Sequence, residues 1–292
     1  MNRGGKMLFD NEFLNLLDKL EILLKVSQNS NLSGEKLSKK KGVGLDFKDY
    51  RQYQLGDDYR YIDWNLYSRL EQLFLKEFVA ERGMNVHFLI DKSKSMVYPN
   101  SKKFILAKKI AAALSYISLT HFDEVEAVFF ANKLKESTGK MRGKTKIKYL
   151  FNFLEKVECE GRTNIKKIAN IFIKREKKAG LIFIISDFLD KDFLEAFKII
   201  KSRGWKVFLL NINDNLNALK DQGQFILEDI ETNKTKDIII DEETIEEYKS
   251  LKIDYYDHVQ NFANKYQINY QDIDLDDDLM NILLSVLKYR IK

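Results

Sequence analysis

The sequence predicts an α/β fold in which a doubly wound, mostly parallel sheet carries helices on both faces, preceded by an N-terminal helical and β extension. From residue 86 onward, short apolar runs rich in β-branched residues alternate with segments of helical periodicity, which is typical of strands joined by helical crossovers. The 292 residues are 45% hydrophobic and 32% charged, a composition that indicates a globular protein. One proline and 13 glycines indicate long elements with short connections.

The extension is expected to occupy residues 1–84. Residues 11–27 place leucine and phenylalanine at helical spacing and predict a helix, and residues 29–41 form a polar break. Residues 45–79 hold short aromatic-rich pieces, of which residues 73–78 have the pattern of a strand. We therefore place a boundary after residue 84 and expect the main domain to span residues 85–292.

The main domain should begin with a strand at residues 86–90, a nearly continuous apolar run that ends at Asp91. Such a run is typical of a parallel strand buried on both faces. The later strands are expected at residues 125–131, 181–186 and 205–212, with helices at 101–120, 144–157, 164–178 and 191–203. An antiparallel hairpin is expected from residues 225–230 and 236–240, followed by closing helices at 242–266 and 277–288.

Charge is distributed unevenly along the chain. Residues 86–220 carry 27 basic and 14 acidic side chains, whereas residues 221–292 carry 8 and 17. The basic middle is either a surface for an acidic molecule or a set of solvated helix faces that the acidic tail partly balances. Its lysine clusters lack the interleaved aromatic residues of single-stranded nucleic-acid surfaces, and we expect no nucleic-acid partner.

Cysteine and histidine are too scarce for thiol or zinc chemistry. Cys159 is the single cysteine, no histidine lies near it in sequence, and the three histidines have no ligand spacing. The longest purely apolar run is about five residues, whereas a helix that crosses a membrane needs roughly 20. The N-terminus lacks a signal-type apolar core. We expect an inert thiol, no membrane span and a cytoplasmic location.

Oxygen-bearing side chains follow the predicted strands at the points where they end. Asp91, Ser93 and Ser95 come after the first strand of the main domain, Asp187 comes after the third, and Thr163 opens a helix between them. Ligands of open α/β sheets collect at this edge, and hard oxygen ligands suit Mg²⁺, with Mn²⁺ or Ca²⁺ as alternatives. These residues predict a divalent cation site that leaves room for an outside ligand. The simpler interpretation is a strand-end loop with Thr163 as a helix N-cap.

The run Asp-x-Ser-x-Ser at residues 91–95, with the separate Thr163 and Asp187, resembles the metal-ion-dependent adhesion site of von Willebrand factor A domains. Residues 50–64 (YRQYQLGDDYRYIDW) resemble the signature of the bacterial domain-of-unknown-function 58 family. The resemblance extends from residue 42 to the C-terminus and includes the region of the predicted hairpin. In one departure from the family pattern, the loop usually written Gly-Gly-Thr-Asp contains Arg162, which brings a positive charge beside the expected ion.

The resemblance implies a von Willebrand A-like, Rossmann-like fold and a non-enzymatic module that partners a MoxR-type AAA+ ATPase. Such a pair would act like a chaperone in assembling or remodelling a client protein, which would offer a carboxylate to the ion. The ATPase would be a separate chain, because this sequence has no Gly-x-x-x-x-Gly-Lys-Ser/Thr loop.

The segment at residues 50–64 has two possible roles. It is either a docking element or a structural staple, in which Arg and Asp side chains pair and Trp64 anchors the segment to the core. We favour the staple.

Two other functions stay open at this point. A metal-dependent phosphohydrolase would use Asp91 as its nucleophile, but aspartyl phosphatases of the haloacid dehalogenase kind place a second Asp two residues later, where this chain has Ser93. A vestigial, metal-free interaction domain would keep the fold without the ion.

Overall fold

The computed structural model describes residues 7–31, 46–79, 83–98, 100–190, 192–213, 222–229 and 234–288. The chain divides into two compact units, a large one formed by Met1–Val26 with Met84–Lys292 and a small one formed by Ser27–Gly83. Most of the first helix, up to Val26, groups with the large unit, whereas we expected this helix to belong to the extension.

The large unit is built on a seven-stranded, mostly parallel sheet, as the sequence predicts. Along the sheet the order is β11-β8-β7-β3-β4-β5, with β6 also paired to β4. The parallel strands are β3 (Asn85–Asp91), β4 (Glu124–Phe130), β7 (Leu181–Ser186), β8 (Lys206–Asn213) and β11 (Asn269–Asp274). Strands β5 (Leu134–Ser137) and β6 (Met141–Arg142) run antiparallel to β4. Strands β5, β6 and β11 were not predicted from the sequence.

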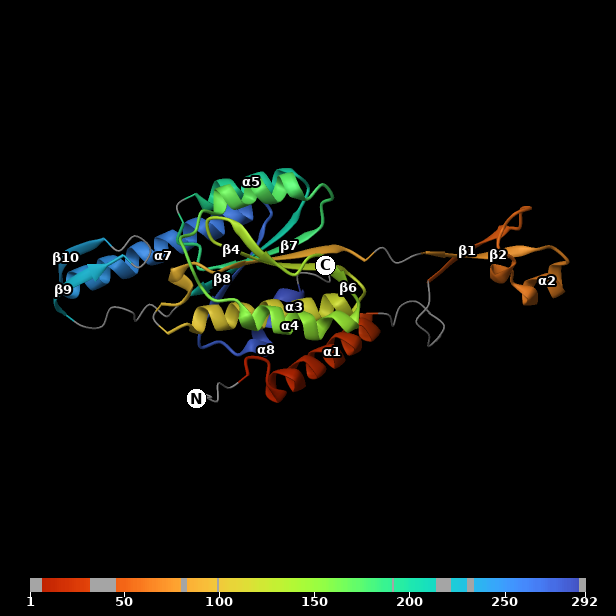
Figure 1. Cartoon of the computed structure of the whole chain (residues 1–292), viewed down its shortest axis with the longest axis horizontal. Helices are drawn as coiled ribbons and strands as arrows, with labels where there is room; N and C mark the ends of the chain where they lie inside the picture. Colours follow the sequence, from red (N-terminus) through yellow and green to blue (C-terminus); the bar gives the residue numbers. More distant parts are fainter. Residues whose placement is uncertain are drawn as a thin grey trace. The chain divides into compact units, whose positions relative to one another are not determined.

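Helices cover both faces of this sheet (Figure 1). Helices α3 (Lys102–Thr120), α4 (Ile147–Lys156) and α8 (Leu279–Lys288) contribute to one apolar core. Helices α5 (Ile165–Arg175), α6 (Phe193–Ser202) and α7 (Glu242–Lys265) contribute to the other. Because both faces are covered, the central strands are buried on both sides, which explains why their sequences are continuously apolar. Among the described residues, no helix combines the length and the apolar character needed to cross a membrane.

Helix α1 (Asn11–Asn31) packs against the core that α3, α4 and α8 share (Figure 1). Its buried side chains are spaced three or four residues apart, so they form one stripe on the helix. They are Phe13, Leu17, Leu20 and Leu24. Just before the helix, the ring of Phe9 stacks on Phe151 of α4 at 4.7 Å. This apolar stripe explains why α1 groups with the large unit.

The predicted hairpin is present as strands β9 (Gly223–Glu228) and β10 (Thr235–Ile240), which pair antiparallel. The side chains of β9 are exposed throughout. Helix α7 follows directly, and the Asp241 carboxylate accepts a hydrogen bond from the backbone of Thr244 to cap its first turn.

The small unit contains an antiparallel pair, β1 (Asp46–Gln52) and β2 (Phe74–Val79), with a 3₁₀ turn η1 (Tyr59–Tyr61) and helix α2 (Trp64–Leu70) between them. Strand β2 matches the strand predicted at residues 73–78. Strand β1 lies in the stretch that the sequence analysis described only as aromatic-rich pieces.

Candidate metal centre

Asp91 is the centre of the candidate site. It is the last residue of β3, its side chain is buried, and only 1% of the residue is exposed. Three neighbouring groups donate hydrogen bonds to its carboxylate: the backbone N–H of Ser93 at 2.8 Å, the Ser186 hydroxyl at 2.6 Å and the Thr163 hydroxyl at 3.1 Å. These donors fix the orientation of the Asp91 carboxylate at the carboxyl edge of the sheet.

The side chains of Ser93 and Ser95 contact each other in the turn that follows β3. A 3₁₀ turn, η2 (Lys94–Met96), follows Ser93, and the two hydroxyl oxygens lie 2.9 Å apart. The backbone N–H of Lys94 donates to the carbonyl of Gly161, which ties this turn to the loop that carries Thr163. The five residues chosen from the sequence therefore include four that the structure joins through direct hydrogen bonds.

Thr163 is not the N-cap of helix α5. The cap is Asn164, whose side-chain oxygen accepts a hydrogen bond from the backbone N–H of Lys167 at 2.9 Å. The Thr163 hydroxyl donates to the Asp91 carboxylate instead. The simpler interpretation of Thr163 as a capping residue is therefore wrong.

Asp187 reaches the site through a strained turn after β7. Phe188 has a φ of 49°, which is uncommon for a large side chain. Its backbone N–H donates to the Ser186 hydroxyl, its carbonyl accepts a hydrogen bond from the Tyr255 hydroxyl of α7, and its ring packs on Phe193. The packing holds the turn in this conformation, and the turn places Asp187 beside the cavity.

The charge of Asp187 acts on the Asp91 carboxylate. Burial, together with the negative charge of Asp187, raises the pKa of Asp91 to about 7, although the hydrogen bond from Ser186 opposes this shift. Two buried carboxylates in such proximity favour a cation between or beside them. The donor set of carboxylate and hydroxyl oxygens fits Mg²⁺ or Mn²⁺ better than a soft metal.

An open cavity of about 700 Å³ lies over these residues and gives them access to solvent. Asp91, Ser95, Thr163 and Asp187 line it. Its rim also includes Arg162, Asp190, Asp192 and the hairpin residue Asp229. A ligand that entered the cavity would therefore meet four of the five residues predicted from the sequence, whereas Ser93 is buried beneath them.

Two residues of the site were missed at the sequence level. Ser186 donates to Asp91, and the Lys103 ammonium lies 2.9 Å from Asp187 Oδ2. A signal for Lys103 was available, because it shares the helical stripe of the buried residues Ala107 and Leu114. Ser186 had no comparable signal, since a serine that ends a strand is common.

The small unit places the residues at 50–64 in local structural roles. Arg51 pairs with Asp57 at 2.9 Å. Asp63 caps helix α2 and accepts a hydrogen bond from the Tyr50 hydroxyl at 2.8 Å. Trp64 does not anchor the segment as expected: it is 60% exposed and meets Tyr67 edge-on. The Arg–Asp pairing that the staple interpretation expects is thus present, whereas its expectation that Trp64 anchors the segment to the core is wrong.

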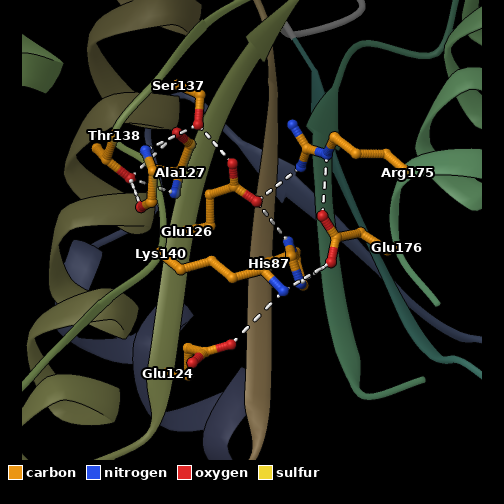
Figure 2. A network of polar contacts seen from close by, with 10 residues as sticks. His87, Glu124, Glu126, Ala127, Ser137, Thr138, Lys140, Arg175 and Glu176 are labelled. Atoms are coloured by element: carbon orange, nitrogen blue, oxygen red, sulfur yellow. Dashed lines mark hydrogen bonds and ion pairs between the residues drawn. The ribbon is translucent and has the colours of Figure 1, made fainter. Parts of the chain in front are cut away.

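A second polar cluster lies inside the large unit, away from the candidate site (Figure 2). His87 on β3 lies 3.1 Å from Glu126 on β4 and 3.8 Å from Glu176, so three buried side chains offer ligand atoms for a metal. Arg175 contacts both glutamates, at 2.6 and 2.9 Å, and Lys140 lies 2.9 Å from Glu176. These two cations balance the two carboxylates, and a metal ion would have to displace them.

The cluster also affects the protonation of its members. Burial opposes ionisation of Glu126, but the contacts with His87, Ser137 and Arg175 keep its pKa below the usual value. We therefore interpret this cluster as a structural network between β3, β4 and the end of α5.

Comparison with solved structures finds distant likenesses. The BatB protein of Bacteroides thetaiotaomicron is 17% identical, with a TM-score of 0.42, over 72% of this chain and 100% of that one. The pilus adhesin SpaC of Lactobacillus rhamnosus GG is 14% identical, with a TM-score of 0.44, over 72% of this chain and 30% of that one.

Sequence comparison finds relatives that cover most of the chain. Uncharacterized proteins of Mycobacterium bovis and Mycobacterium tuberculosis are each 24% identical over 234 residues, which is 77% of this chain and 73% of theirs. The model of the family described as "Protein of unknown function DUF58" matches residues 49–255, more than half of the chain, and this protein belongs to that family.

Proposed function

We propose that this protein is a non-enzymatic, metal-dependent protein-binding module. The cation would be held by the oxygen atoms of Asp91, Ser93, Ser95, Thr163 and Asp187. The observation that carries the proposal is that the Thr163 hydroxyl and the Ser93 backbone donate hydrogen bonds to the buried Asp91 carboxylate, beside an open cavity that Ser95 and Asp187 also line. A divalent cation, with Mg²⁺ preferred, would supply an electrophilic centre for a carboxylate from another protein.

The residues have distinct roles in this proposal. Asp91 supplies the central negative charge, and Ser186 and the backbone of Ser93 hold its carboxylate in place. Ser95 and Thr163 line the cavity and supply neutral oxygen ligands. Neutral ligands keep the positive charge of the ion available to an incoming acid.

The proposed partner is a MoxR-type AAA+ ATPase, which would supply the force to assemble or remodel a client protein. The support is the family membership together with the likeness of residues 50–64 to the family signature. Within that segment, Tyr59, Tyr61 and Trp64 are exposed. Exposed aromatic side chains are frequent at protein interfaces, so we assign docking to these aromatics and local support to the neighbouring polar residues.

Isothermal titration calorimetry with Mg²⁺ and Mn²⁺ tests the metal site. We expect binding by the wild type and none by Asp91→Ala, because that change removes the central carboxylate. Asp192→Ala is the matched control, since Asp192 lines the rim of the same cavity but is exposed. Identical traces for the wild type and Asp91→Ala would exclude the proposed site.

Co-purification tests the partner. A tagged form of this protein should retain a MoxR-type ATPase when Mg²⁺ is present, and release the ATPase or its client in EDTA. Asp91→Ala should behave in Mg²⁺ as the wild type behaves in EDTA. Retention of ATPase and client that depends on neither EDTA nor Asp91 would contradict a metal-dependent contact.

One observation favours a second candidate, a metal-free interaction domain. The Lys103 ammonium already neutralises Asp187 without any added ion. In this alternative the cavity would bind a partner through hydrogen bonds alone, and the calorimetric experiment above would show no heat of metal binding for any variant.

A further inference from the structure

Lys103 is a buried cation whose position needs an explanation. It lies in the first turn of α3, and only 4% of the residue is exposed. The start of a helix carries a partial positive charge and disfavours a lysine, and lysine is seldom buried without a partner. A lysine at this place must therefore have a compensating contact.

The compensating contact is a carboxylate of the candidate metal site. Lys103 Nζ lies 2.9 Å from Asp187 Oδ2, and each side chain is 5% exposed. The neighbouring Lys102 has no such environment, because it is exposed. Of two adjacent lysines in the same helical turn, one faces solvent and the other supplies a positive charge to the site.

The net charge of the site shows the effect of the Lys103 ammonium. Ionised Asp91, ionised Asp187 and Lys103 sum to a single negative charge, and a divalent cation would turn that sum into a single positive charge. With an uncharged residue in place of Lys103, the same two carboxylates would hold a divalent cation at exact neutrality. Charges at these separations in a buried site interact by several times the thermal energy.

We propose that Lys103 sets the charge of the site, so that the protein binds a divalent cation less tightly and the loaded site attracts a carboxylate from another protein. This inference rests on the proposed function. A neutral loaded site would hold its cation more firmly and would have less attraction for an acidic partner. Lys103 thus lowers the affinity of the site for the cation and raises the affinity of the loaded site for the acid.

Calorimetry with Mn²⁺ alone as the probe tests the first half of the proposal. Lys103→Met should bind Mn²⁺ at least about tenfold more tightly than the wild type, because a nearby positive charge is lost. Lys102→Met, the matched control, should stay within about twofold, because Lys102 is exposed and solvent screens its charge. Equal or weaker Mn²⁺ binding by Lys103→Met, repeated by Lys103→Gln, would overturn the proposal.

Acetate, as a carboxylate probe, tests the second half. Protein-bound Mn²⁺ relaxes water protons, and acetate that displaces this water lowers the relaxation rate. We expect the acetate concentration at half-effect to be about tenfold higher for Lys103→Met than for the wild type. An unchanged acetate dependence would contradict the role of Lys103 in attracting an acid.

Two further variants separate a charge effect from a folding defect. Removing the ammonium leaves Asp187 buried without its partner, so Lys103→Met should melt at a lower temperature than the wild type in EDTA. Mn²⁺ should then raise its melting temperature by more than it raises that of the wild type. Lys103→Gln, which can still donate a hydrogen bond to Asp187, should also bind Mn²⁺ more tightly, whereas Lys103→Arg should resemble the wild type.

The outcomes distinguish this inference from the proposed function. If neither the wild type nor any Lys103 variant binds Mn²⁺ in a manner that depends on Asp91, the metal site and the role of Lys103 both fail. If the wild type binds Mn²⁺ through Asp91 but neither Lys103→Met nor Lys103→Gln binds it more tightly, only the role of Lys103 fails.

Discussion

At the scale of single residues, burial and a neighbouring negative charge both disfavour ionisation of Asp91. Its carboxylate is removed from water and lies close to a second carboxylate, so its pKa is raised to about 7. Hydrogen bonds from Ser93, Thr163 and Ser186 compensate for only part of this cost. A cation would relieve the remaining part, which is why the site is a candidate for metal binding.

Asp91→Asn should stabilise the metal-free protein at high pH. A carboxyl with a raised pKa in the folded state stabilises it below the unfolded-state value near 4, and this contribution is lost as the pH rises through about 7. In EDTA, the gain in unfolding free energy for Asp91→Asn over the wild type should be larger at pH 8 than at pH 5, by on the order of 2 kcal/mol. Urea denaturation measures it, and a gain that is equal at both pH values would contradict the raised pKa.

Cys159 should be an unreactive thiol. Burial, followed by the negative charge of Asp91, raises its pKa to about 12, and only the thiolate is nucleophilic. At pH 8 we expect iodoacetamide to alkylate Cys159 on the order of 100-fold more slowly than free cysteine. Mass spectrometry would follow the reaction, with the urea-unfolded protein as the control that should react at the ordinary rate. Rapid alkylation of the folded protein would contradict this environment.

At the scale of elements, the apolar face of helix α1 determines which core the helix packs against. Its buried side chains join the core formed with α3, α4 and α8, while Ile22 and Leu23 on the same helix are exposed. The same periodicity that predicted the helix also predicted an apolar face. It did not identify the surface that this face covers.

Leu20→Ala should therefore destabilise the large unit. Leu20 is fully buried in the shared core, and such truncations cost about 2–4 kcal/mol through lost burial and the cavity left behind. Ile22→Ala in the same helix is the matched control, because Ile22 is 60% exposed, and it should cost less than about 1 kcal/mol. Urea denaturation followed by the fluorescence of buried Trp205 measures both. Equal effects of the two substitutions would show that α1 does not pack on this core.

At the scale of the whole molecule, the two units differ greatly in the apolar cores they possess. The large unit has an extensive core on each face of its sheet. Among the side chains described in the small unit, the buried hydrophobic ones are Ile62 and Leu75. A two-stranded sheet with so little buried apolar surface is only marginally stable.

Hydrogen exchange should reveal this difference in the intact protein. Backbone amides of β1 and β2 should exchange at least about 100-fold faster than those of β3 and β7, because local opening of the small unit exposes little apolar surface. Mass spectrometry of peptides from the two units, after exchange at one pH and temperature, makes the comparison. Equal protection of the two pairs of strands would mean that the units open together.

Much of the fold follows from local sequence patterns. The four central parallel strands were predictable because strands buried on both faces have continuous apolar sequences. The helices between them were predictable from their periodicity, and the hairpin from two short strand patterns that flank a turn. Strand β11 was not, since its sequence is mostly polar. As an edge strand it depends on pairing with β8, about 60 residues earlier in the chain. A pattern that spans only a few neighbouring residues contains no information about such a distant partner.

The sequence alone determined which residues end the parallel strands, because strand ends are visible as breaks in apolar runs. That was sufficient to select Asp91, Ser93, Ser95 and Asp187, and Thr163 was selected at the start of a predicted helix. Only the tertiary structure decided that Ser186 and Lys103 complete the site and that Trp64 faces solvent. The physical reason is that burial and charge pairing depend on which surfaces pack against each other. Those contacts are made by residues that lie far apart in the chain.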